Sequence, residues 1–167
     1  MADYYSPTVV QQPIPVTDLT PLERLVLSLV FDAEVDRDAI WFHSDIGPSD
    51  SIGMSIDDLQ AAFQASQGIH SAIAVFVGEC LAAAPPNDTD IDIDLSVVSW
   101  ALMLQDIVLR SPTLDYITVV AAFTCSRMRA DGFGGMAVLI TPDAIRCKST
   151  HDILEEFLAA RDVNRSA

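Results

Sequence analysis

The chain is poor in basic residues. Its 167 residues include nine Lys and Arg against 24 Asp and Glu, which gives a formal net charge of −15. No Lys or Arg occurs from Asp38 to Leu109, a stretch of 72 residues that contains eleven acidic residues. Nucleic acids and anionic membranes repel such a chain, so we expect neither as a direct partner. A segment of one charge sign forms no ion pairs within itself, which favours a basic protein as the partner.

Cysteines are also few, and membrane and targeting signals are missing. Cys80, Cys125 and Cys147 lie far apart and form no CxxC pair, so the sequence predicts reduced thiols and no zinc site. The longest apolar stretch, Ile69 to Ala84, is too short to cross a bilayer. The N-terminus has neither the basic nor the apolar region of a signal peptide. We therefore expect a cytoplasmic protein.

The apolar content predicts a folded core. Half of the residues are hydrophobic, and the mean hydropathy is +0.32, which excludes a disordered chain. The length suits one domain, which we place at residues 20–162, followed by a frayed tail over 163–167. Residues 1–19 contain three prolines and form an extended arm. Branched and aromatic residues in this arm favour its docking onto the body of the protein.

Apolar periodicity and capping residues predict five helices. The first has Thr20 as its N-cap and Glu23 closing a capping box, and it extends to about Ala33. The third is the apolar stretch 69–84, which Pro85 and Pro86 end. The others cover residues 55–67, 96–110 and 149–162.

The strand patterns predict two hairpins and one isolated strand. Residues 39–45 pair with 51–54, residues 116–125 pair with 134–141, and 90–95 alternate strictly between Asp and an apolar residue. The fold class is therefore α+β, with a mostly antiparallel sheet packed with about five helices. The order helix, hairpin, helix occurs at 20–66 and again at 96–160, which is a weak indication of a pseudo-repeat.

The acidic residues provide the main candidate site. Asp90, Asp92 and Asp94 point outward from one strand, and Asp57 and Asp58 open a predicted helix. We expect these five carboxylates to form an acidic face that binds a basic partner. A calcium loop is excluded, because the positions that need Gly and an acidic residue are occupied by Ile and Ser.

Two weaker candidates involve other chemistry. Arg127, Arg129 and Gly132 lie in a glycine-rich loop that could hold an anion, although phosphate loops join a strand to a helix and this loop joins two strands. The alternative is a hairpin tip whose charged side chains hold no anion. His43 and Asp45 share one face of a predicted strand and could form an acid–base or metal pair, but a spacing of two is common by chance.

Several segments together resemble a family of small bacterial proteins that are often carried on plasmids and other mobile elements. These segments are TPLER (20–24), LQDIV (104–108), RSP (110–112), FTCS (123–126), DGFGGM (131–136) and LIT (139–141). That family has no assigned activity, so the resemblance implies a biological setting and transfers no catalytic residue.

The preferred interpretation is a non-enzymatic acidic interaction or regulatory protein. It would bind a basic protein, such as a nucleic-acid-binding enzyme, by mimicking a polyanion, and we expect no catalytic residue, metal or cofactor. Two alternatives stay open: a homo-oligomeric module such as a homodimer, and a small metal-dependent hydrolase using His43 and Asp45. Genomic base composition and solubility also produce acidic surfaces, and scattered charge would favour those explanations.

Overall fold

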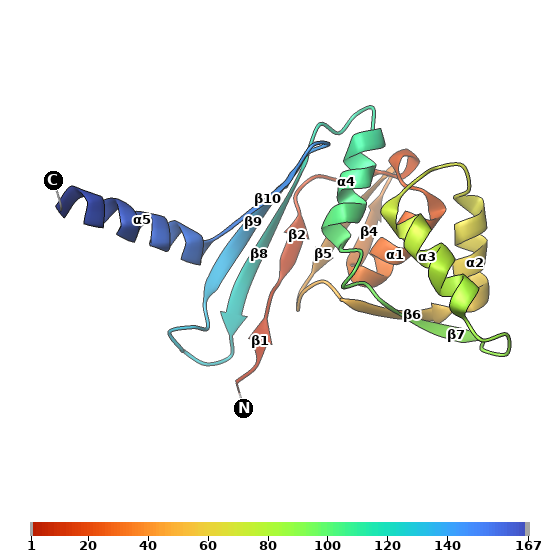
Figure 1. The fold of residues 1–167 in the computed structure, drawn as a ribbon, viewed down its shortest axis with the longest axis horizontal. Coiled ribbons are helices and arrows are strands. Elements are labelled where there is room, and N and C mark those ends of the chain that lie inside the picture. Colours follow the sequence, from red (N-terminus) through yellow and green to blue (C-terminus); the bar gives the residue numbers. More distant parts are fainter. Residues whose placement is uncertain (1, 166–167) are drawn as a thin grey trace.

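The structure is a computed structural model that describes residues 2–165, with the side chains of residues 2–161. Within these residues, five α-helices accompany an antiparallel sheet of eight strands and a second sheet of two strands (Figure 1). The expected α+β class with a mostly antiparallel sheet and five helices is confirmed. No helix of the described part combines the length and apolar character that a membrane span requires.

The large sheet combines strands from both ends of the chain. Its strands are β1 (Tyr4–Tyr5), β2 (Thr8–Val10), β3 (Ile14–Pro15), β4 (Asp32–Asp36), β5 (Ala39–Ser44), β8 (Ile117–Cys125), β9 (Gly134–Ile140) and β10 (Ile145–Ser149). β10 and β4 form the two edges, with β9, β8, β2 and β5 in order between them. β6 (Ser51–Ser55) and β7 (Asp90–Asp94) form the separate two-stranded ribbon.

The helices lie mainly on one face of the large sheet. They are α1 (Pro21–Val30), α2 (Ile56–Ala65), α3 (Ala72–Ala83), α4 (Trp100–Arg110) and α5 (Thr150–Arg165), with a short 3₁₀ helix, η1 (Val16–Asp18). α1 and α4 cover the sheet, α2 and α3 pack beyond α1 near the β6–β7 ribbon, and α5 projects away from the sheet (Figure 1). We call the face under α1 and α4 the covered face, and the opposite one the open face.

The core fills the space between the covered face and the helices. Phe42 of β5 and Ile117 of β8 are fully buried there, together with Leu22 of α1 and Leu104 of α4. The strands alternate buried and exposed residues, as the two-residue period of a half-covered sheet requires. The start of α1 follows its sequence signal, because Thr20 and Glu23 form the predicted capping box.

The N-terminal arm belongs to the large sheet. β1 and β2 pair with β8, β3 pairs with β5, and β2 also pairs with β5. Val10 and Ile14 of the arm are fully buried. The docking that its branched residues indicated is therefore observed, and the arm connects the N-terminal strands of the sheet to the C-terminal ones.

The first predicted hairpin is wrong. β5 does not pair with β6, because β4 occupies one edge of β5 and the arm occupies the other. β6 pairs instead with the Asp-rich strand β7, which therefore lies outside the large sheet. The second predicted hairpin is observed as β8 and β9, and β10 extends it as a third strand that the sequence pattern did not reveal.

Helix boundaries also differ from the predictions. α1 ends at Val30, and the chain continues as β4 where three more helical residues were expected. α4 begins at Trp100 rather than at residue 96, so Val97 lies before the helix and is 71% exposed. α5 continues to Arg165, where a frayed tail was predicted from residue 163, and the rest of that tail, residues 166–167, lies outside the described residues.

The two segments of the suggested pseudo-repeat have similar element orders. Residues 21–65 contain a helix, three strands and a helix, and so do residues 100–165. Their pairing differs, because β6 leaves the large sheet whereas β10 stays at its edge. The pseudo-repeat of helix, hairpin and helix therefore remains a hypothesis.

Candidate interaction surfaces

The five predicted acidic residues lie in elements that adjoin at the β6–β7 ribbon. Asp90, Asp92 and Asp94 are exposed on one face of β7, opposite small residues of β6, while the intervening isoleucines face inward. β6 leads directly into α2, whose first turn carries Asp57 and Asp58. A backbone hydrogen bond of 2.9 Å from Ile56 N to Thr89 O joins the start of α2 to the start of β7. We call these five carboxylates the acidic surface.

Local geometry favours negative charge at two places on the acidic surface. Asp94 Oδ1 accepts a hydrogen bond of 2.9 Å from the backbone N–H of Ser96, and this bond holds the pKa of Asp94 below its usual value. The N-terminus of α2 favours the negative charges of Asp57 and Asp58. Gly53 leaves room for Asp92, because a Cβ at residue 53 would lie 2.7 Å from Asp92 Oδ1.

No cation neutralises the acidic surface in the part of the chain whose side chains are described. The ion pairs there join Arg110 to Glu23, Arg129 to Asp131, Lys148 to Glu156 and His151 to Glu155. Each of these pairs lies outside the ribbon and α2. The acidic surface is therefore available to an external cation.

The charge of the protein is unevenly distributed along the chain. Residues 110–167 contain seven basic and seven acidic residues, so the whole net charge of −15 comes from residues 1–109. The ribbon, α2 and α3 lie at the opposite end of the molecule from α5 (Figure 1). The acidic surface is thus far from α5, the C-terminal helix of this electrically neutral segment.

The predicted anion-binding tip is a loop between β8 and β9. Arg129 Nε donates to Asp131 Oδ1 at 3.2 Å, and this contact lowers the pKa of Asp131. Gly132 is buried, and a Cβ there would lie 2.7 Å from Cys125 Cβ, so this glycine is required for close packing of the loop. Arg127 is exposed. An anion at this tip would have to compete with Asp131 for Arg129.

His43 and Asp45 do not form the centre of a site. His43 is half-buried on the open face of β5, and Asp45 is exposed just beyond the end of that strand. Among the described residues, no three His, Cys, Asp or Glu side chains are grouped in a way that could hold a metal ion. The geometry therefore adds no argument for a metal-dependent hydrolase.

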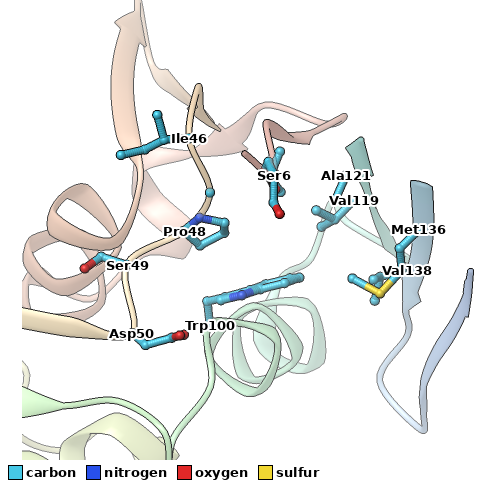
Figure 2. Close-up of a pocket in the computed structure, with 12 residues that line it drawn as sticks. Ser6, Ile46, Pro48, Ser49, Asp50, Trp100, Val119, Ala121, Met136 and Val138 are labelled. Carbon is cyan, nitrogen blue, oxygen red and sulfur yellow. Dashed lines mark hydrogen bonds between the residues drawn. The ribbon is translucent and has the colours of Figure 1, made fainter. Parts of the chain in front are cut away.

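A pocket of about 500 Å³ opens on the covered face, at the start of α4 (Figure 2). The indole of Trp100 extends between the loop before β6 and the strands β8 and β9 (Figure 2). Val119, Val138 and Met136 provide apolar walls, and Asp50 lies at the rim. Such a pocket suits an apolar group, but no described cluster of titratable side chains converges on it.

Sequence reasoning did not identify Trp100 as a lining residue. Trp100 lies within the predicted helix 96–110, but it is the first residue of α4, where it packs edge-on against Phe31 with ring centroids 5.8 Å apart. Ser99 occupies the N-cap position of α4, but its side chain makes no capping hydrogen bond, so this helix start lacks the local signal that marks α1.

Comparison of this chain with protein-family models, with curated proteins and with solved structures gave no match. The geometry and charge of the surfaces described above are therefore the basis for assigning a function.

Proposed function

We propose that the protein is a non-enzymatic interaction protein that binds a basic protein partner through the acidic surface. The observation that carries this proposal is that exposed carboxylates at 57–58 and at 90–94 lie on adjoining elements, the start of α2 and β7, without a described cation beside them. Such a group attracts a positively charged partner over roughly the Debye length, about 8 Å at physiological ionic strength. Electrostatic complementarity of this kind raises the association rate and selects against acidic partners.

The proposed partner is a protein that normally binds nucleic acid, because such proteins present basic surfaces that bind negatively charged groups. Same-face residues of β7 are spaced by about 6.6 Å, whereas a single DNA strand carries a charge about every 3.4 Å along the helix axis. The β7 row alone is therefore sparser than nucleic acid, and Asp57 and Asp58 supply additional charge beside it. The resemblance to proteins of mobile elements supports the same proposal, because such elements benefit from occupying enzymes that act on nucleic acids. We propose that the protein binds such an enzyme in the cytoplasm.

Binding of a fluorescent nona-arginine peptide, measured by anisotropy at low salt, tests this proposal. We expect the variant Asp90→Asn/Asp92→Asn/Asp94→Asn to bind about tenfold more weakly. Three exposed charge contacts of about 0.5 kcal/mol each amount to about 1.5 kcal/mol, and about 1.4 kcal/mol corresponds to a tenfold change in affinity. A matched control, Asp3→Asn/Asp115→Asn/Asp143→Asn, removes three exposed carboxylates elsewhere. This control should bind within about twofold of the wild type. Equal weakening in both variants would mean that the charge acts diffusely and would refute the proposal.

A further inference from the structure

The open face of the large sheet carries exposed apolar side chains at its centre. Val9, Trp41, Val120 and Leu139 are 48%, 38%, 42% and 39% exposed, although each lies in a strand of this sheet. α1 and α4 pack on the other face, and α5 projects from the β10 edge (Figure 1). Contiguous apolar area of this kind on a soluble domain marks an interaction site.

The two edges of the open face carry opposite charges. At the β4 edge, Asp32 and Glu34 are exposed, and at the β10 edge, Arg146 and Lys148 are exposed. The strand register places them in rows across the sheet. One row consists of Asp32, His43, Val9, Val120, Ala137 and Lys148. A second row lies two residues further along the strands. It contains Glu34 and Trp41 on the β4 side of the sheet, and Thr118, Leu139 and Arg146 on the β10 side.

This arrangement complements itself under a two-fold rotation. A rotation of 180° about an axis parallel to the strands turns the face over and reverses the order of the strands. β10 then faces β4 of the second copy, β9 faces β5, and β8 faces β2. Each acidic edge meets a basic edge, and the apolar centres meet each other. A two-fold interface forms every such contact twice.

We propose that the protein forms a homodimer in which two open faces pack together about this axis. Lys148 of one protomer lies opposite Asp32 of its partner, Arg146 lies opposite Glu34, and Val120 lies opposite Val9. Two sheets packed in this way lie about 10 Å apart with nearly aligned strands. The proposal concerns a surface separate from the acidic surface and does not depend on the proposed function.

A hollow on the open face has the size and position to receive a side chain of the second copy. Its volume is about 460 Å³, and its lining includes Val120, Leu139 and Arg146 of β8, β9 and β10. The two-fold rotation places Trp41 of the partner over β9 and therefore over this hollow. A tryptophan inserted into an apolar pocket is the commonest kind of hot spot in protein interfaces.

Two features of the protomer moderate the strength of the dimer. Lys148 Nζ already donates to Glu156 Oε2 of α5 at 2.6 Å, so Arg146 is the more readily available cation. Six strands spaced by about 4.8 Å give an open face roughly 24 Å wide, and five residues along a strand cover roughly 17 Å. Each protomer therefore offers on the order of 400 Å², about half the area of a standard interface. We therefore expect a dimer that forms in the micromolar range, so its detection requires a concentration series.

Sedimentation velocity over a concentration series tests the homodimer. We expect the wild type to shift from monomer to dimer, and Trp41→Ala to weaken dimerisation at least tenfold. The variants Arg146→Glu/Lys148→Glu and Asp32→Lys/Glu34→Arg each place like charges on both edges, so each alone should remain monomeric. An equimolar mixture of the two should form a heterodimer, because every edge then meets its opposite. This recovery also shows that both variants are folded.

The contrary results are equally clear. A wild type that stays monomeric at the highest concentration, or a mixture of the two charge variants that does not associate, would overturn the homodimer. A dimer that forms normally in Trp41→Ala and in both charge variants would place the interface on another surface. Asp90→Asn/Asp92→Asn/Asp94→Asn should dimerise like the wild type, which separates this test from that of the acidic surface.

Discussion

Replacing Arg110 with alanine is expected to lower the free energy of unfolding by about 3–5 kcal/mol, because the change leaves a buried carboxylate without its cation. The side chain of Glu23 is fully buried near the start of α1. Arg110, at the end of α4, donates from Nη2 to Glu23 Oε1 at 2.8 Å and to Oε2 at 2.7 Å. The pair therefore connects two helices through residues that lie 87 positions apart in the chain.

Urea unfolding followed by circular dichroism measures this effect. Arg24→Ala is the matched control, because Arg24 is exposed on the same helix as Glu23 and its loss should change stability by less than about 0.5 kcal/mol. Adding Glu23→Gln to Arg110→Ala should recover part of the loss, since a neutral amide can still accept the capping hydrogen bond from Thr20 N. If Arg110→Ala and Arg24→Ala destabilise equally, the buried ion pair has no special role.

Leu104→Ala should destabilise the protein by a similar amount, about 3–5 kcal/mol. Leu104 is fully buried where α4 packs on β8, β9 and β10, so its truncation leaves a cavity in the core. Leu102 lies two residues earlier on α4 and is 38% exposed. Leu102→Ala should therefore cost about 1 kcal/mol or less, and both variants can be compared by the same urea unfolding. The opposite ranking would mean that the other side of α4 faces the sheet.

Local signals predicted the elements that depend on local chemistry. The capping box of Thr20 and Glu23 fixed the start of α1, and Ser149 with Asp152 formed a similar reciprocal cap at α5. The alternation of Asp and Ile correctly gave β7 an exposed acidic face. These features are readable from sequence because each requires only neighbours within a few residues.

Strand partners could not be predicted in the same way. A two-residue period states which face of a strand is buried, but not which edge is free. β5 was assigned to β6 because they are close in the chain, yet β4 and the arm occupy both edges of β5. β4 itself was missed because its sequence, DAEVD, is polar and exposed, as suits an edge strand.

The residues of the candidate site were predicted, but the strand pairing that brings them together was not. Asp90, Asp92 and Asp94 were selected for one strand face, and Asp57 and Asp58 for one helix start. Their proximity follows from the pairing of β6 with β7, which the sequence did not predict. The opposite charges at the edges of the open face were not recognised, because β4 and β10 were not expected as strands.

Titration of the ¹⁵N-labelled protein with nona-arginine is the most direct test of the central claim, that the acidic surface is the docking site for a basic partner. We predict that the largest amide shifts fall in β6, in β7 and in the first turn of α2, and that they diminish as salt is added. Shifts of equal size near Asp3, Asp115 and Asp143, or shifts that salt does not reduce, would contradict the claim.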